Sequence, residues 1–193
     1  GGNLNTGRSY MIGAGTQTSA LGSGGDGGSG SVDNVESYNG SSWTEVADMS
    51  NAREICGGAG ASNTSALVYG DLPSNGVTES WNGTSWTEVN DLNDAVRETA
   101  LVGTYTAALQ AGGKGGSGPP TGTEATVEDW NGVSWQEVAD LNTARYQLNS
   151  GQSGSSSSGV VFGGKPTYNP PTAVTGSTEE WNLPSNTVKV LTD

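Results

Sequence analysis

The chain has 193 residues, of which 32 are glycine and 7 are proline, and its 20 acidic and 7 basic side chains give a formal net charge of −13. Because nucleic acids and anionic membrane surfaces bind clustered Lys and Arg, this balance argues against both as partners. No apolar run approaches the roughly 18 residues of a membrane-spanning helix. The opening residues, GGNLNTGR, lack the basic and apolar parts of a signal peptide.

The residue types that are missing also limit the chemistry. Histidine is absent, which excludes histidine-based triads and metal sites with a histidine ligand. Cys56 is the only cysteine, and we expect it to be a small buried side chain rather than a nucleophile. We therefore expect no enzymatic activity, no cofactor and no bound transition metal.

An internal repeat organises the whole chain. In each unit an arginine follows a small-residue segment, an apolar run then closes on glycine, and an aromatic residue comes next. These aromatic residues are spaced by 43, 49 and 51 residues and are Tyr38, Trp81, Trp130 and Trp181. The repeat predicts one domain over 1–193 with units 4–48, 49–91, 92–140 and 141–193, and residues 1–3 align with the end of a preceding unit.

The predicted elements are short strands in every unit. In the first unit, Asn39-Gly40 predicts a hairpin turn, as do the Asn-Gly pairs at 82–83 and 131–132 in the next two units. The runs 65–69 and 160–162 are short, apolar and bounded by glycine, which is typical of buried strands. No stretch has the apolar spacing of an amphipathic helix. A repeat of this length with about four short strands predicts the antiparallel blades of an all-β propeller.

The order of these features resembles the kelch repeat across nearly the whole chain. The resemblance implies four kelch-type blades of four strands each, which can belong to a longer propeller. Segments such as LNTARYQL and NGTSWTEV are similar to kelch-like array proteins of marine bacteriophages. Asp71 replaces the second glycine of unit two, and Val188 replaces a tryptophan in unit four, as expected for the atypical unit that ends a repeat array.

Residues that recur in phase are expected to be architectural. One buried ion pair or backbone-binding fork per blade is predicted for the arginines, Arg8, Arg53, Arg97 and Arg145. A ring of arginines that binds an anion is the alternative. Packing between blades is predicted for Trp43, Trp86 and Trp135, with sugar stacking as the alternative.

The segment between the glycine pair and the next aromatic residue varies most in length. Its loops, 26–34, 71–77, 114–124 and 165–177, must emerge on one rim of a propeller, where recognition commonly occurs. The candidate binding residues in or beside these loops are Asp26, Asp33, Asp71, Lys114, Glu124, Lys165 and Tyr168. The alternative for each is a solvated loop side chain. Calcium is not expected, because the loops contain no Asp-x-Asp series.

Three functions fit the sequence to different degrees. The first is a non-catalytic virion component of a bacteriophage, such as a tail fibre, adhesin or decoration protein, that binds a host-surface glycan or protein or another virion protein. An intracellular or secreted kelch scaffold for protein–protein binding is the second. The third is a carboxylate-dependent glycan hydrolase, which the repeat phase of the acids disfavours. We expect the first, located on the extracellular particle, with oligomerisation possible.

Overall fold

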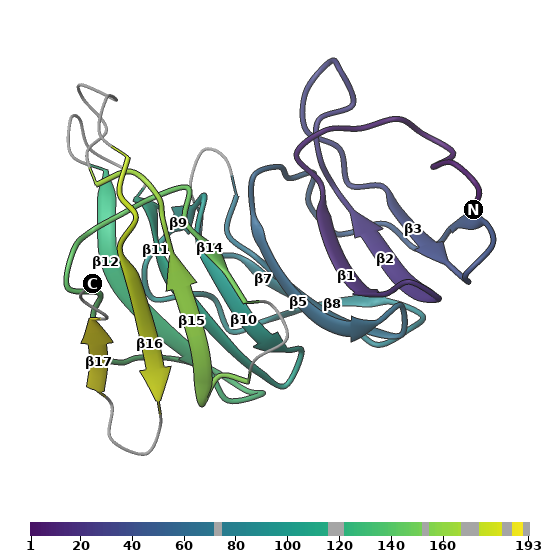
Figure 1. The fold of residues 1–193 in the computed structure, drawn as a ribbon. Coiled ribbons are helices and arrows are strands. Elements are labelled where there is room, and N and C mark those ends of the chain that lie inside the picture. The colour runs from purple at the N-terminus through teal and green to yellow at the C-terminus, as the bar shows by residue number, and fades with distance from the viewer. Residues whose placement is uncertain (72–74, 116–121, 152–154, 167–173, 183–186, 191–193) are drawn as a thin grey trace.

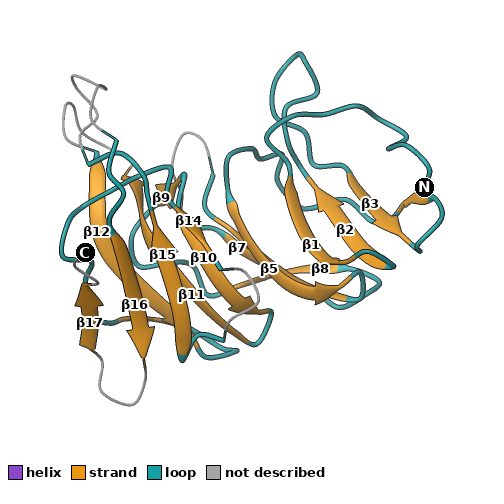
Figure 2. Cartoon of the chain, viewed as in Figure 1, coloured by secondary structure: helices purple, strands orange, loops and turns teal. Residues whose placement is uncertain are grey.

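The computed structural model describes residues 1–71, 75–115, 122–151, 155–166, 174–182 and 187–190. All regular structure in these residues is β-strand (Figure 2). None of the described residues belongs to a helix that could cross a membrane.

Four small antiparallel sheets follow one another along the chain. The first contains β1 (Ile12–Thr16), β2 (Ser19–Ser23), β3 (Val35–Tyr38) and β4 (Trp43–Glu45). The second contains β5 (Gly57–Ser62), β6 (Ser65–Tyr69), β7 (Thr78–Trp81) and β8 (Trp86–Val89). Each sheet is a meander in which consecutive strands are neighbours, so the pairing depends on local turns.

The third and fourth sheets have the same order. The third contains β10 (Ala100–Thr104), β11 (Ala107–Gly115), β12 (Thr123–Trp130) and β13 (Trp135–Glu137), and the two-residue β9 (Val96–Arg97) pairs with the end of β11. The fourth contains β14 (Asn149–Ser150), β15 (Ser158–Phe162), β16 (Thr178–Asn182) and β17 (Thr187–Val190).

The Asn-Gly hairpins have a common local cause. In the first, the Asn39 side-chain oxygen accepts the amides of Ser41 at 2.9 Å and Ser42 at 3.0 Å. Gly40 then adopts a φ of 94°, which only glycine tolerates readily. The turns at Asn82 and Asn131 repeat these bonds. The sequence signal for these three turns is therefore confirmed.

The sheets are arranged as the blades of a four-bladed β-propeller (Figure 1). The inner strands of consecutive blades are in contact, β1 with β5, β5 with β10, and β10 with β14. One apolar cluster lies at each of the three junctions, as between Ile12 and Leu21 of the first blade and Trp81 of the second. The all-β propeller prediction is confirmed.

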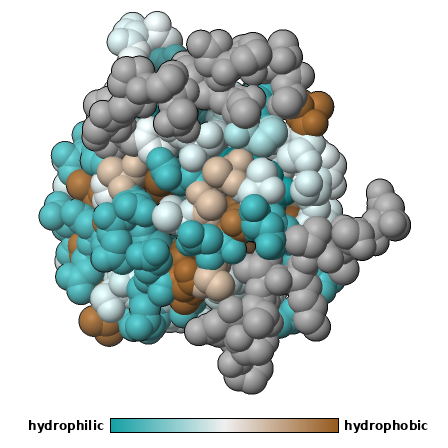
Figure 3. Space-filling model, turned by 90° about the vertical axis from the view of Figure 1, so that its left-hand side faces the viewer, coloured by the Kyte–Doolittle hydropathy of each residue, from teal (hydrophilic) through white to brown (hydrophobic). Residues whose placement is uncertain are grey.

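Apolar side chains are concentrated at these junctions rather than on the outside. The side of the molecule drawn in Figure 3 is mostly hydrophilic, with small separate hydrophobic patches. A structure with so few hydrophobic residues, 32% of the chain, thus places them where blade packs on blade.

Candidate functional site

A small cavity lies where the inner strands of all four blades begin. It has a volume of about 160 Å³ and is lined by residues 11–13, 56–58, 99–101 and 148–150. None of these described lining residues carries an acidic or basic side chain. Cys56 is the titratable group among them; it is half-buried rather than fully buried as expected, and desolvation raises the pKa of its thiol to about 12. The cavity therefore offers an uncharged lining of small and polar residues, Thr99, Asn149 and Ser150 among them, and no acid–base pair.

Strained backbone directly precedes each of the four segments that line this cavity. One non-glycine residue per blade has a left-handed conformation, with φ between 54° and 58°: Tyr10, Ile55, Glu98 and Gln147. Backbone hydrogen bonds join these residues from blade to blade, Ile55 N–H to Tyr10 O, Glu98 N–H to Ile55 O, and Gln147 N–H to Glu98 O. The sequence contains no signal for this conformation, because the four residues are of different types and none is glycine or asparagine.

Three arginines anchor the loops that follow the second strand of their blades. The Arg145 side chain is fully buried, and its Nη2 lies 2.5 Å from Glu179 Oε1. Its Nη1 donates to the carbonyls of Gly163 at 3.3 Å and Ser177 at 2.9 Å, which lie on either side of the variable loop. One guanidinium thus fixes both ends of a loop to a strand carboxylate, which the planar fork of arginine allows.

The first blade repeats this clamp, and the second has a weaker form of it in which Arg53 binds the carbonyl on one side of the loop. Arg8 Nη2 bonds Glu36 at 2.9 Å, and Arg8 Nη1 donates to the carbonyls that flank the first loop, those of Gly24 and Asn34. Arg53 lies 3.4 Å from Glu79 and donates to the Val77 carbonyl at 3.0 Å. All three arginine side chains are at most 1% exposed.

The third blade departs from this arrangement. Val96, not Arg97, occupies the position that Arg53 and Arg145 have in their blades. The evidence is the glycine that each backbone carbonyl contacts. The Val96 carbonyl packs on Gly70, as the Arg53 carbonyl packs on Gly24 and the Arg145 carbonyl on Gly112. Arg97 Nε instead lies 3.6 Å from the neighbouring Glu98, and both side chains are 13% exposed. The extra residue in LNDAVR, compared with LNTAR, accounts for the shift.

A glutamine supplies the missing donor in that blade. Gln110 is fully buried on β11, opposite Glu128 on β12. Its Nε2 donates to the Gly112 carbonyl at 2.5 Å, the equivalent of the Gly24 and Gly163 carbonyls that arginine binds elsewhere. Sequence reasoning missed Gln110, although a lone amide inside the apolar run AALQAGG was a signal that a buried polar role existed.

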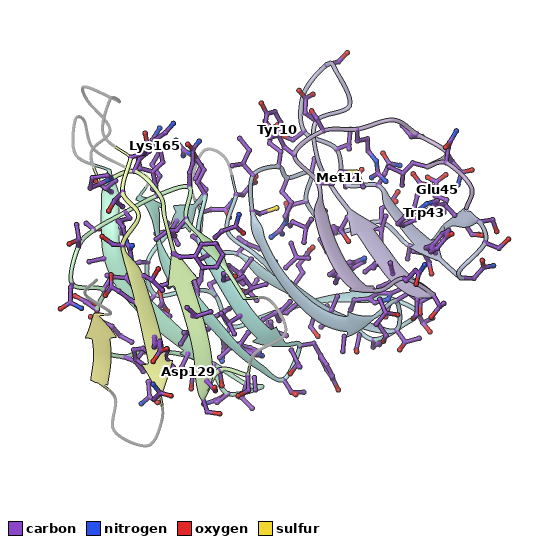
Figure 4. All side chains as sticks on the ribbon, in the orientation of Figure 1. Tyr10, Met11, Trp43, Glu45, Asp129 and Lys165 are labelled. Carbon is purple, nitrogen blue, oxygen red and sulfur yellow. The ribbon has the colours of Figure 1, made fainter. Side chains whose placement is uncertain are left out.

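The candidate binding residues after the glycine pairs occupy one rim. Three of them occupy the same position of their repeats: Asp26, Lys114 and Lys165. Each forms an antiparallel β-pair with the residue that follows the clamp position of its blade, which is Ser9, Arg97 and Tyr146 respectively. Figure 4 places Lys165 and Tyr10 at this end of the blades and Asp129 at the opposite end. Lys165 Nζ also lies 5.8 Å from the Tyr146 ring centroid.

Several of these candidates have structural partners. The Asp26 carboxylate accepts the Gly28 amide at 2.7 Å within its own loop. Asp71 is 6% exposed and accepts the Glu54 amide at 3.2 Å. Asp33 and Glu124 are half-buried, and their backbone carbonyls accept the amides of Met49 and Arg145.

The remaining candidate, Tyr168, lies outside the described residues, as do parts of the loops 71–77, 114–124 and 165–177. The structure thus brings the described candidates to one rim, with Asp71 turned inward.

Trp86 and Trp135 occupy the side of their blades that packs on the preceding blade, as predicted. Trp86 Nε1 donates to the Ala47 carbonyl at 3.1 Å, and Trp135 Nε1 donates to Thr78 Oγ1 at 3.1 Å, each bond reaching the preceding blade. Trp43 lies on the equivalent face of the first blade and is half-buried.

The fold and this rim define the chain as a β-propeller with a small uncharged axial cavity and loops of variable length around it. No family model matches the chain. The comparison with curated proteins likewise finds no match. Among the described residues no group of three or more Cys, Asp or Glu side chains is placed to hold a metal ion.

Proposed function

We propose that this chain is a non-catalytic recognition module, a kelch-like propeller of a bacteriophage virion that binds a host-surface glycan or another virion protein. The contact is made by the rim loops, in a tail fibre, adhesin or decoration protein. The kelch part of this proposal is supported by the order of arginine, glycine-bounded apolar run and aromatic residue in each unit. The phage part is supported by the similarity of segments such as LNTARYQL and NGTSWTEV to kelch-like array proteins of marine bacteriophages.

The observation that carries the proposal is the anchoring of the loops. Arg8 and Arg145 each bind the carbonyls on both sides of a variable loop from a buried position. Loop length can therefore change without disturbing the blade, because the loop ends are fixed by a side chain that is independent of the loop sequence. Recognition commonly evolves on loops that a rigid scaffold holds in this way.

The recurring acids support a binding role over a hydrolytic one. A glycosidase needs two carboxyl groups that are free to exchange protons or attack the sugar. The acids that recur on the third strand of each blade are instead buried and hydrogen-bonded: Glu36, Glu79, Glu128 and Glu179. A scaffold for protein–protein binding would use the same rim and differs from the proposal only in its partner.

A binding assay with a chemical readout separates these functions. Labelled chain is incubated with candidate host cells, and the bound fraction is measured after sedimentation. Binding that periodate oxidation of cell-surface glycans abolishes, without release of new reducing ends, is the expected result for a glycan-binding module. Binding removed by protease treatment alone would instead support a protein partner. Release of reducing ends by the purified chain would contradict the non-catalytic assignment.

A further inference from the structure

The basic side chains of this acidic chain are distributed unevenly. The clamps use three of the seven inside the blades, at no more than 1% exposure: Arg8, Arg53 and Arg145. Another, Lys189, lies on β17, the outer strand of the fourth blade. The other three lie together on the rim of the third and fourth blades, and we call them the basic sector: Arg97, Lys114 and Lys165.

The charge of the basic sector is opposite to that of the first two blades at equivalent positions. Lys114 and Lys165 occupy the position that Asp26 has in the first blade. Arg97 follows the clamp position of its blade, where the second blade has Glu54. Because the backbone pairing at the Asp26 position is retained, the change of sign alters the surface chemistry of the rim without altering the fold.

Backbone contacts hold the basic sector together across a blade junction. Arg97 and Lys114 are cross-strand neighbours on β9 and β11. The residue before Lys114 donates its amide to the Arg145 carbonyl at 2.7 Å. Tyr146, the next residue along, exchanges two backbone hydrogen bonds with Lys165, at 3.1 and 2.9 Å. This continuous path places the three cations on one surface that spans the third and fourth blades.

The basic sector keeps an excess of positive charge. Two carboxylates lie within it, that of Glu98 3.6 Å from Arg97 Nε and that of Glu124 against the backbone of Gly115. Lys165 has no acidic partner among the described residues. Its Nζ lies 5.8 Å from the Tyr146 ring centroid, an arrangement that orients the ammonium group and leaves its charge uncompensated.

We propose that the basic sector binds an acidic sugar, one that carries sulfate or carboxylate, within the glycan that this module recognises; the inference rests on the proposed function. Ammonium and guanidinium groups bind such oxyanions through charge-assisted hydrogen bonds. A short anionic segment fits this surface. A long polyanion such as a nucleic acid does not, because the rest of the chain, with a net charge of −13, repels it. The acidic residues of the first two blades thereby fix the orientation of the glycan.

Isothermal titration calorimetry of the 193-residue chain at about 0.05 M salt tests this assignment. The probes are three hexasaccharides: a sulfated galactan, its desulfated form and a polyuronate. The wild type is expected to bind at least one acidic probe about 10-fold more tightly than the neutral one. Lys165→Gln should weaken that binding about 3-fold, and Lys114→Gln with Lys165→Gln about 10-fold. Lys189→Gln is the matched control, because it removes the same charge from the outer strand of the same blade, and it should bind as the wild type does.

The urea midpoint of each variant shows that it is folded, and the other outcomes contradict the inference. Equal affinity for acidic and neutral probes would overturn it and leave glycan recognition in place. Equal losses in Lys165→Gln and Lys189→Gln would overturn it too, because net charge alone would then explain the binding. Tighter binding of a polyglutamate peptide would indicate an acidic protein partner instead. Failure of every probe to bind would also overturn the inference, and the cell-binding assay then decides separately on the proposed function.

Discussion

Replacing Arg145 by methionine removes the donor that joins a strand to both ends of its loop. The Arg145 and Glu179 side chains are at most 3% exposed and lie 2.5 Å apart. In Arg145→Met, Glu179 keeps its bonds from the Asn142 amide and side chain but becomes a buried carboxylate without a countercharge. Breaking such a pair costs about 3–5 kcal/mol, which lowers the Tm of a chain of this size by roughly 10 °C.

The assay is urea denaturation followed by tryptophan fluorescence, with Arg97→Met as the matched control. Arg97 is 13% exposed and its Nε lies 3.6 Å from Glu98, a longer and less buried contact than that of Arg145, so its replacement should cost less than that of Arg145. Adding Glu179→Gln to Arg145→Met should recover part of the loss, because it removes the uncompensated charge. Equal costs for Arg145→Met and Arg97→Met would refute the clamp.

Three further predictions concern single residues. Gln110→Leu should destabilise the third blade by about 1–3 kcal/mol, because it leaves the buried Gly112 carbonyl without its donor; a neutral effect in urea denaturation would contradict this. Burial raises the pKa of Asp129, so the folded chain holds this proton more tightly than the unfolded chain and loses stability as the pH rises through the folded pKa. Asp129→Asn should therefore raise the urea midpoint at pH 7, and by less at pH 4; the opposite trend would show that the sign is wrong. With a thiol pKa of about 12, Cys56 should react with a disulfide reagent at pH 8 on the order of 1000-fold more slowly than an ordinary thiol, until urea exposes it; fast labelling of the native chain would contradict this.

The strands were predictable because each blade is a meander built from neighbouring segments. Asn-Gly turns and short apolar runs are signals of such local pairing. The strands β2, β6, β11 and β15 accordingly lie at the glycine-bounded apolar runs. Pairing between strands that are distant in sequence, which patterns do not reveal, is not needed for this fold.

The details of the clamp were not predictable from the repeat alone. Aligning Arg97 with the other arginines ignored that a single extra residue moves a side chain away from its equivalent position, so Val96 took the buried place. The compensating donor, Gln110, comes from a different strand, and the sequence contains no rule that links the two. Asp71 was grouped with the loop residues by position, whereas in three dimensions its carboxylate turns inward to the Glu54 amide.

The central claim is that the blades provide stability and the rim loops provide binding. Exchanging one loop tests this claim most directly. The segment 165–177 is replaced by the shorter 71–77, whose base is held by an equivalent arginine. Cell binding and the urea midpoint are then measured on the same preparation. The account predicts an unfolding midpoint close to that of the wild type together with clearly weakened binding. Undiminished binding by the folded exchange variant would contradict it.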